Sequence, residues 1–333
     1  MRRKRSALIL LFTVTALCAA AQTPQAPLRL RYAHMNPADS PSGLQAQYFA
    51  DRVAERTGGA VIISVFPDSA LGSIAEMAAQ VSAGTVAMHH NTYGGLQPLL
   101  QDLGLFDTPY LYRDVDHLLA ATDPQRSPVL KELNERLVAE RKVRILYSFY
   151  FGTRELTANA PVFAPPDLAG KRIRVIPSAI YETAVEGMGA VAIPIDWKDV
   201  PAALAAGRAE GQENPVSTIL TSKLYASQNY LMLTHHIMGS EPVVINETVW
   251  RSLSAENKAV FRDVAAETRE WISAYIRSNE ERDLQTLRKK GMVVIGTEEG
   301  LRVDAFRASV NAAVERRFGA EWGKYYRRIR AME

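Results

Sequence analysis

The longest helical pattern in this sequence runs from Ser254 to about Lys289, and Gly291 follows it. Serine is a favoured N-cap residue, and glycine is common just after the end of a helix. At 1.5 Å per residue, a helix of this length would extend for roughly 50 Å. That length exceeds the diameter of one small domain. We therefore expect two domains that are bridged by one long helix.

The first part of the chain alternates between strand patterns and helix patterns. Strands are expected at residues 28–33, 61–66 and 85–88, and helices at residues 43–57 and 73–83. In the second helix, Ser73 and Glu76 have the spacing of a capping box. This order predicts an α/β fold with a parallel sheet, in which ligands bind beside the carboxyl ends of the strands. The loops that follow the strands are therefore expected to border one crevice.

The remainder of the chain continues the mixed pattern. Helices are expected at residues 115–121, 127–141, 179–188, 198–206 and 306–332, and strands at residues 143–150, 170–177, 191–195, 242–246 and 293–294. The segment Gly187–Ala192 has the glycine spacing of a dinucleotide site, but a helix precedes it and a strand follows. Phosphate binding needs the opposite order, so no nucleotide site is expected there.

The chain opens with the pattern of a secretory signal peptide. A basic segment (residues 2–5) precedes an apolar run (residues 7–17), and three alanines end at Ala21. The apolar run is too short to span a bilayer as a helix. We expect cleavage after Ala21 and export to the periplasm. Lipidation of Cys18 is the alternative, but Leu17 stands before it where a small residue is expected.

Removal of this leader changes the chemistry that the chain can support. The formal charge of +3 includes four basic leader residues, so the mature chain carries about −1. A net positive charge was the main support for nucleic-acid binding, and the mature chain does not have it. Cys18 is the only cysteine, so the mature chain has no disulfide, no thiolate nucleophile and no cysteine metal ligand. About 312 residues remain, which is enough for two domains of ordinary size.

A cationic strand is the strongest local sign of a binding site. At residues 170–177, Arg172 and Arg174 alternate with apolar residues, which gives one cationic face and one apolar face. A guanidinium at the end of such a strand can bind both oxygens of a carboxylate and stays charged at any working pH. Arg154 likewise follows the strand expected at residues 143–150. The alternative for the two arginines of the strand, Arg172 and Arg174, is that they are solvated or pair with a nearby glutamate.

A series of motifs occurs in a fixed order along the mature chain. They are Pro67–Gly72 followed by Glu76, Gly170–Pro177, Pro194–Val200, Gly211–Thr218, Ser222–Tyr225 and Leu233–His236. Together they resemble the extracytoplasmic solute-binding proteins of TRAP transporters, the DctP family. The resemblance implies a two-domain periplasmic-binding-protein-like fold with a central cleft, joined by crossing strands and a long helix. It also implies capture of an organic acid by hinge closure and its delivery to TRAP permease subunits in the membrane.

The resemblance implies roles for individual residues at the carboxylate end of the ligand. Arg174 would make a bidentate contact to the carboxylate, and Arg154 would support it as a second cation. Asn214 would donate a hydrogen bond to the same end, and Trp197 would pack against the ligand.

Other residues are expected near the far end of the ligand. Glu76 falls where an acidic residue meets that end, and Asn91 and Tyr93 lie in a polar loop where ligand-specific groups occur. His34 follows the first strand and is a further candidate contact. Because Glu76 would repel a second carboxylate, we rank a sugar acid first, a C4-dicarboxylate second and a keto or aromatic acid third.

The resemblance and the long helix together give expected domain boundaries. The signal peptide would occupy residues 1–21, the first domain residues 28–151 and about 240–270, and the second domain residues 152–239 and about 280–333. The helix at about 254–289 would bridge both domains, and we expect a monomer.

Two other classes of function remain open at this point. A ligand-sensing subunit that docks on a signalling receptor would have the same cleft as a transport protein. A secreted enzyme is disfavoured, because the chain has no Gly-x-Ser-x-Gly, no His-Glu-x-x-His and no phosphate-binding loop. No cofactor or metal is expected, because the neighbours in His89-His90 and His235-His236 would point to opposite faces of a strand.

Overall fold

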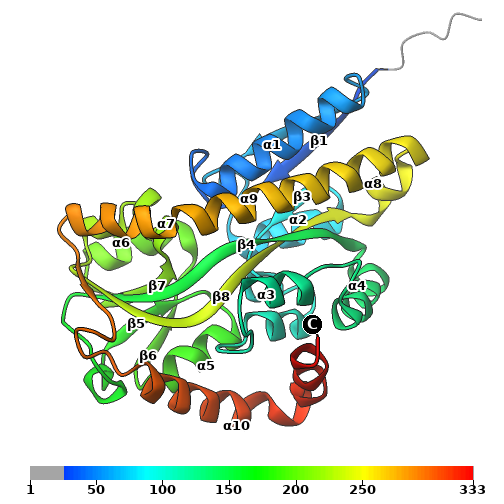
Figure 1. Cartoon of the computed structure of the whole chain (residues 1–333). Helices are drawn as coiled ribbons and strands as arrows, with labels where there is room; N and C mark the ends of the chain where they lie inside the picture. Colours follow the sequence, from blue (N-terminus) through cyan, green and yellow to red (C-terminus); the bar gives the residue numbers. More distant parts are fainter. Residues whose placement is uncertain (1–25, 333) are drawn as a thin grey trace, which may run out of the picture.

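The computed structural model describes residues 26–332, so the expected signal peptide, its cleavage site and Cys18 lie outside the described residues. The strands are β1 (Leu28–Ala33), β2 (Val61–Phe66), β3 (Met88–His90), β4 (Val143–Ala158), β5 (Arg172–Val175), β6 (Val191–Pro194), β7 (Gly211–Pro215), β8 (Tyr230–Asn246) and β9 (Val293–Ile295). The helices are α1 (Pro41–Arg56), α2 (Ile74–Ala83), α3 (Val115–Ala121), α4 (Pro128–Arg141), α5 (Ala179–Gly187), α6 (Val200–Ala205), α7 (Val216–Thr221), α8 (Glu247–Ser252), α9 (Ala255–Lys289) and α10 (Val303–Arg330). These elements confirm the predicted α/β class (Figure 1).

One sheet connects the two halves of the molecule. Its strand order is β2-β1-β3-β8-β4-β7-β5-β6, and β9 pairs with β8 beside this path. The long strands β4 and β8 are antiparallel neighbours and run together across the molecule (Figure 1). We call the part around β1, β2 and β3 the first lobe, and the part around β5, β6 and β7 the second lobe.

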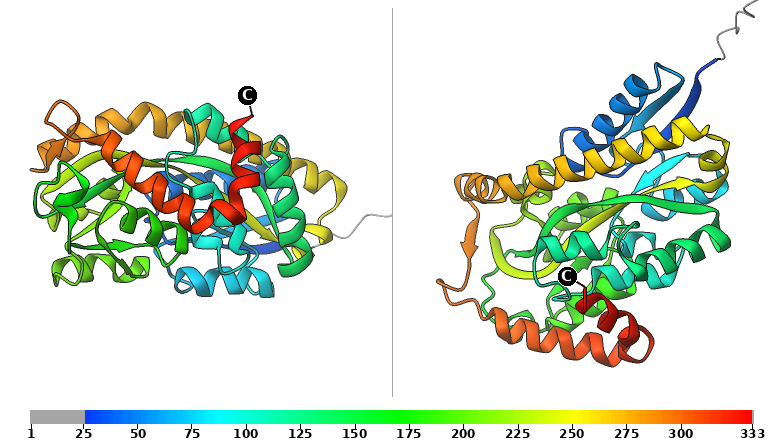
Figure 2. Two further views of the ribbon diagram at one scale, coloured as in Figure 1. Left: turned by 90° about the horizontal axis from the view of Figure 1, so that it is seen from below. Right: turned by 45° about the vertical axis from the view of Figure 1, so that its right-hand side comes forward.

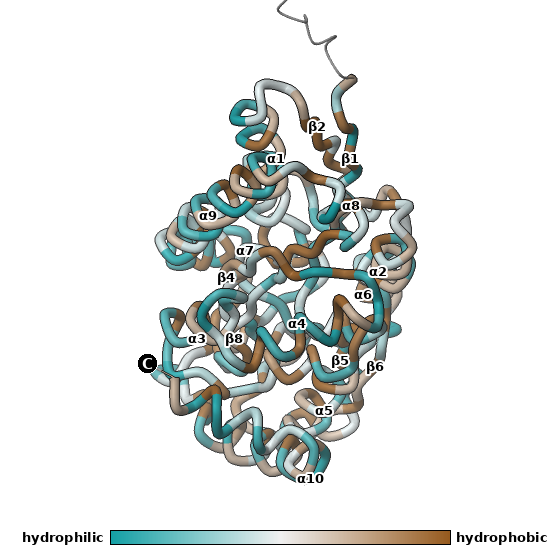
Figure 3. The backbone as a smooth tube through the Cα atoms, turned by 90° about the vertical axis from the view of Figure 1, so that its right-hand side faces the viewer, coloured by the Kyte–Doolittle hydropathy of each residue, from teal (hydrophilic) through white to brown (hydrophobic). Residues whose placement is uncertain are grey.

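Each lobe has a small parallel core of its own. In the first lobe β1 pairs in parallel with β2 and β3, and in the second lobe β5 pairs in parallel with β6 and β7. Apolar residues concentrate in the strands and alternate with polar residues along the outer helices (Figure 3). This pattern buries the sheet beneath amphipathic helices, as an α/β fold requires.

Two long helices hold the lobes together. The predicted helix at 254–289 is confirmed as α9, and the Ser254 hydroxyl accepts a hydrogen bond from the Asn257 amide at 3.1 Å. This helix packs against α1 of the first lobe, β4 and α7 of the second lobe (Figures 1 and 2). The last helix, α10, packs mainly on α5 and also contacts α4, so it too reaches both lobes.

The capping box predicted for α2 is present, but the strand after that helix begins later than expected. Ser73 and Glu76 each bond the other's backbone amide. The expected strand at 85–88 is replaced by β3 at Met88–His90. The reason is that the amides of Thr85 and Val86 both donate to the Gln80 carbonyl and so complete the end of α2.

The crossing strands are longer than the sequence pattern suggested. Strand β4 continues to Ala158, so Arg154 lies within a strand rather than after one. Strand β8 begins at Tyr230 rather than Pro242, and β7 forms where no strand was expected. These strands are buried on both faces and therefore lack the alternation of apolar and polar residues that marks a half-exposed strand.

We propose that the lobes meet at Gly152 and Gly239, which would divide the chain at residues 151/152 and 239/240. These two glycines pair with each other, and the pairing of β4 with β8 shifts register on either side of them. Gly152 has φ of 119°, which other residues rarely adopt, and a Cβ there would lie 2.7 Å from Pro215 Cβ. Bulges of this kind bend a strand pair, which suits a hinge.

Candidate functional site

Arg174 comes from the carboxyl-terminal half of β5 and is almost fully buried, with 1% exposure. Its Nε donates to the Ile195 carbonyl oxygen at 2.9 Å, while Nη1 and Nη2 have no hydrogen-bond partner among the described residues. Burial lowers the pKa of Arg174 to about 10, so the group is still charged at neutral pH. A buried, charged guanidinium with two free donor nitrogens is well suited to bind an anion.

Arg154, on β4, is also fully buried but already has a carboxylate partner. Its Nη2 donates to Glu213 Oε1 at 2.8 Å and to the Glu213 carbonyl oxygen at 2.7 Å. Only Nη1 lacks a partner within the described chain. The guanidinium lies over the Tyr181 ring, with Cζ 5.0 Å from the centroid. Arg154 therefore combines a structural ion pair with one donor that is free to meet a ligand.

Glu213, on β7, neutralises Arg154. Burial alone would raise the pKa of Glu213, but the Arg154 guanidinium and a hydrogen bond with His236 hold it at about 2. His236 Nε2 lies 3.2 Å from Glu213 Oε2, and its Nδ1 lies 2.8 Å from the Thr234 hydroxyl. The pair leaves the Arg174 charge without a counter-ion among the residues that the structure describes.

The neighbouring arginine on the same strand has a different environment. Arg172 is exposed and donates to the carbonyl oxygens of Gly207 and Arg208 at 3.0 and 3.1 Å. The predicted cationic face of this strand is therefore divided between a surface residue and a buried one. The alternative considered for Arg172 and Arg174 holds for Arg172, which is exposed and lies 3.5 Å from Glu210 Oε2, and is wrong for Arg174, which is buried.

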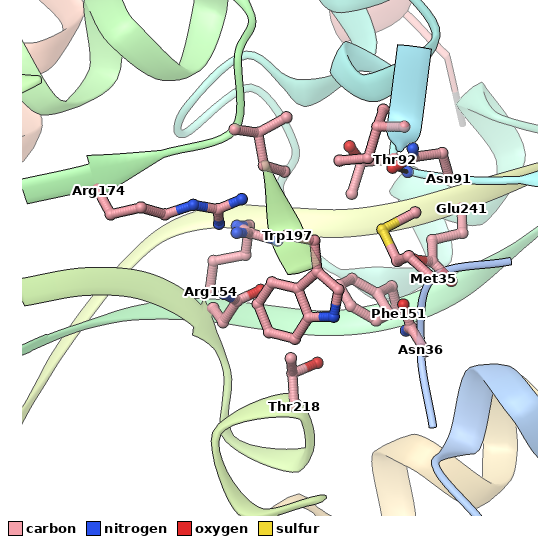
Figure 4. Close-up of a pocket in the computed structure, with 13 residues that line it drawn as sticks. Met35, Asn36, Asn91, Thr92, Phe151, Arg154, Arg174, Trp197, Thr218 and Glu241 are labelled. Atoms are coloured by element: carbon pink, nitrogen blue, oxygen red, sulfur yellow. Dashed lines mark hydrogen bonds between the residues drawn. The ribbon is translucent and has the colours of Figure 1, made fainter. Parts of the chain in front are cut away.

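The free nitrogens of both buried arginines meet at one cavity between the lobes, with an empty volume of about 310 Å³ (Figure 4). Its lining residues are Met35, Asn36, Ile74, Asn91, Thr92, Phe151, Arg154, Arg174, Ile176, Trp197, Asn214, Thr218 and Glu241. They come from both lobes and from the crossing strands.

The structure brings together five of the eight residues that the sequence singled out: Arg174, Arg154, Asn214, Trp197 and Asn91. Asn214 Nδ2 donates to Gln212 Oε1 at 2.6 Å, which fixes the amide on β7. The Trp197 ring lies 5.6 Å from Arg174 Cζ. Asn91 Nδ2 is buried and has no partner within residues 26–332.

The other three candidates do not line the cavity. Glu76 completes the cap of α2, where its Oε2 accepts from the Ser73 amide at 2.7 Å. Tyr93 is buried, and its hydroxyl bonds Ser148 Oγ at 2.7 Å. His34 is buried and stacks on His90 with ring centroids 4.7 Å apart, and neither of its ring nitrogens has a hydrogen-bond partner among the described residues. Glu76 and Tyr93 are thus bonded within the first lobe, whereas His34 is held there by stacking.

Glu241, on β8, lines the cavity and was missed by the sequence analysis. A signal was present, because a single carboxylate interrupts the otherwise apolar run that ends this strand. An ionisable residue inside a buried strand needs a partner or a function. Burial raises the pKa of Glu241 to about 8.

The two lobes also touch each other around the cavity. Asp196, at the start of a short turn in the second lobe, accepts from the Ile74 amide at the N-terminus of α2 at 3.1 Å. Trp197, beside it, packs against apolar residues of both lobes. Asp107 accepts from the Tyr181 hydroxyl at 3.0 Å, and burial raises the pKa of this carboxyl to about 7. These contacts join the two lobes directly.

Two further observations concern metal sites and membrane-spanning helices. Among residues 26–332, no three His, Cys, Asp or Glu side chains gather in a way that could hold a metal ion. None of the described helices combines the length and the apolar composition needed to cross a membrane.

Comparison with known families identifies the architecture. Residues 32–320 match the family of bacterial extracellular solute-binding proteins, family 7, also called DctP. The chain belongs to this family. Its members are TRAP periplasmic solute-binding proteins, which are binding proteins and not enzymes. The predicted two-domain periplasmic-binding-protein-like fold is thereby confirmed.

Two curated relatives bind different classes of acid. The 2,3-diketo-L-gulonate-binding periplasmic protein YiaO of Escherichia coli is 29% identical over 286 residues, with 85% of each chain covered. The C4-dicarboxylate-binding periplasmic protein DctP of Rhodobacter capsulatus is 26% identical over 316 residues, covering 92% of this chain and 93% of that protein.

A solved structure shows the same fold. A TRAP periplasmic solute-binding protein from Bordetella bronchiseptica, with ligand density assigned as pantoate, superposes with a TM-score of 0.85. It is 29% identical to this chain, and the match covers 92% of this chain and 99% of that one.

Proposed function

We propose that this chain is the periplasmic substrate-binding subunit of a TRAP transporter, which captures an organic acid and delivers it to the membrane permease. The observation that carries the proposal is the uncompensated charge of Arg174. Its two Nη nitrogens are buried beside a cavity and have no partner among the described residues. A ligand carboxylate would supply both the missing charge and the missing acceptors.

The carboxylate would lie between Arg174 and Arg154. Arg174 would offer two donors and Arg154 one, and the Asn214 amide lines the same cavity. Because Glu213 already neutralises Arg154, this end of the cavity carries one net positive charge. One ligand carboxylate would balance that charge. The Trp197 ring would cover the ligand from the second lobe.

Capture would occur by closure of the lobes about the crossing strands. The contact from Asp196 to the α2 N-terminus joins the lobes directly, and it places a carboxylate where the helix dipole favours one. The cavity is formed by residues of both lobes, so separation of the lobes would open it to solvent. The register shifts beside Gly152 provide the bend that such a motion would use.

The proposal also covers export, location and oligomeric state. The leader would direct export, with cleavage after Ala21, and the mature protein would act in the periplasm as a monomer without a cofactor. It would bind its ligand without chemical change. Family membership alone does not choose the acid, since the relatives bind a diketo sugar acid and a C4-dicarboxylate. A receptor-docking sensor subunit is the second candidate, and partner binding separates the two.

A thermal-shift screen of residues 22–333 would test the proposal, with sugar acids, C4-dicarboxylates, keto acids and aromatic acids as ligands. A ligand at 100 times its dissociation constant adds about 2.7 kcal/mol of stability. We expect one class of acid to raise Tm and Arg174→Met to abolish the shift. No shift by any acid, before or after partial unfolding and dialysis to remove a bound ligand, would refute the proposal. Uptake of that acid into vesicles bearing the cognate permease would separate transport from sensing.

A further inference from the structure

Glu241 is the one acidic side chain that lines the cavity within the described part of the chain. It is buried, with 1% exposure, and it faces Phe149 across the pairing of β8 with β4. Figure 4 shows it at one end of the cavity beside Met35 and Asn91, with the two arginines toward the other end. A ligand whose carboxylate sits on Arg174 would therefore extend its other end toward Glu241.

The fold holds this carboxyl group in place from behind. Ser42 donates its hydroxyl to Glu241 Oε2 at 2.7 Å. His90 Nε2 lies 3.7 Å from the same oxygen. Gln45 Nε2 donates to His90 Nδ1 at 3.0 Å, so Nδ1 is the acceptor and Nε2 carries the proton. Tyr147 fixes the Gln45 amide by donating to its Oε1 at 2.8 Å.

The other carboxyl oxygen is left for the ligand. Oε2 of Glu241 accepts a hydrogen bond from Ser42, and His90 Nε2 lies beyond hydrogen-bond distance of it, whereas Oε1 has no hydrogen bond to any residue that the structure describes. The neighbouring polar groups at this end are the neutral side chains of Asn36, Asn91 and Thr92. Both cations of the cavity, Arg154 and Arg174, are at the other end. A second ligand carboxylate would thus meet an acid and no cation, while ligand hydroxyls would find both donors and acceptors.

We infer that Glu241 selects the ligand at its far end, by bonding a hydroxyl group and by excluding a second carboxylate. The inference rests on the proposed function, and it narrows the ligand to a hydroxylated monocarboxylate, the chemical class of the aldonic acids. Like charges placed together cost several kcal/mol, and a buried polar group that loses its partner adds to that cost. A carboxyl group is well suited to this task, because it bonds a hydroxyl in either protonation state.

The test uses two matched pairs of acids. Galactonate and galactarate differ only in a hydroxymethyl or a carboxylate at one end, as do erythronate and meso-tartrate. Calorimetry is done at pH 9, because burial raises the pKa of Glu241 to about 8 and the group is mostly ionised above that value. It should show that the wild type binds the monocarboxylate of at least one pair no less than tenfold more tightly than its dicarboxylate. Glu241→Gln keeps the shape and removes the charge, so it should reduce this ratio at least tenfold.

Two variants control for indirect effects. Glu247→Gln alters another buried glutamate, which bonds Arg144 and does not line the cavity, and it should leave the ratio unchanged. Ser42→Ala leaves the carboxyl group but removes the donor to Oε2, and it should weaken the selectivity without abolishing binding.

The outcomes separate this inference from the function on which it rests. An unchanged ratio in Glu241→Gln, or a wild type that prefers the dicarboxylate, overturns the role of Glu241 while Arg174-dependent binding still supports the proposed function. A wild type that binds none of the four acids overturns the inference about Glu241, and the thermal-shift screen with all four classes of acid then decides the proposed function. A ratio that falls equally in Glu247→Gln would show a structural effect and also overturn the inference.

Discussion

Replacement of Arg174 by methionine is the perturbation for which the structure predicts the most distinctive result. Methionine keeps an apolar stem of similar length but removes the guanidinium. The ligand carboxylate would lose two charge-assisted hydrogen bonds from Nη1 and Nη2. Loss of one partner of a buried charge pair costs about 2–5 kcal/mol, which weakens binding by roughly 30-fold to several thousand-fold.

The same substitution should stabilise the empty protein. Burial lowers the pKa of Arg174 from 12.5 to about 10, which corresponds to about 3 kcal/mol of unfavourable burial of the charge. Against this, the Ile195 carbonyl oxygen loses its donor, which costs about 1 kcal/mol. We therefore expect unliganded Arg174→Met to be about 2 kcal/mol more stable than the wild type, since the buried charge lacks a counter-ion.

The assay pairs calorimetry for affinity with urea unfolding for stability. Arg172→Met is the matched control, because Arg172 lies on the same strand but at the surface. It should change neither quantity by more than about 0.5 kcal/mol. An affinity of Arg174→Met within threefold of the wild type would refute the reasoning. A large loss of stability in the unliganded variant would also refute it, because Arg174 would then be a structural residue.

Three further predictions concern the ion pair, the contact between the lobes and the buried acid. Glu213→Gln should lower the free energy of unfolding by about 3–5 kcal/mol, because it leaves Arg154 buried without its charged partner. A decrease of less than about 1 kcal/mol in urea unfolding would contradict this. Asp196→Ala should raise the ligand dissociation rate about 5- to 30-fold in stopped-flow experiments, because the hydrogen bond to the Ile74 amide and its helix-dipole interaction contribute about 1–2 kcal/mol to closure. An unchanged rate would argue against a closing contact. Burial raises the pKa of Glu241 from 4.5 to about 8. Between pH 4.5 and pH 8 the folded protein therefore binds one more proton than the unfolded chain, and its stability falls as the pH rises through this range. Glu241→Gln should therefore gain stability relative to the wild type by about 1.4 kcal/mol per pH unit from pH 5 to pH 8. A difference between the two proteins that does not change with pH would show that this carboxyl group does not titrate in that range.

Helices whose caps and periodic pattern lie within a short stretch of sequence could be predicted. The long helix α9 and the cap of α2 each depend on residues within a few positions of each other, such as Ser73 and Glu76. The ends of the crossing strands, β4 and β8, could not be predicted in this way. Their length is set by pairing between β4 and β8, which are more than seventy positions apart in the sequence, and no local pattern encodes that pairing.

In the candidate site, too, local sequence patterns revealed some residues, while others depend on contacts between distant parts of the chain. Arg174 stands in a strand with a clear period, and the family resemblance added Arg154, Asn214 and Trp197, which all line the cavity. Their contact with a ligand remains a prediction. Glu241 could not be placed, because its partner Ser42 is 199 positions away and only the folded sheet brings them together.

The resemblance also proposed residues that the fold uses elsewhere. Glu76 was expected at the far end of the ligand, but its carboxylate is bound to the Ser73 amide. Its presence in a capping box was the competing explanation from the sequence, and the geometry favours it. The acid at the far end is instead Glu241, contributed by a strand of the central sheet.

A crystal structure of residues 22–333 with an aldonic acid would test the central claim most directly. We predict that the ligand carboxylate lies between Arg174 and Arg154 within hydrogen-bond distance of their free Nη nitrogens, with hydroxyl groups toward Glu241. A ligand held with its carboxylate away from both arginines, or bound outside this cavity, would contradict the account.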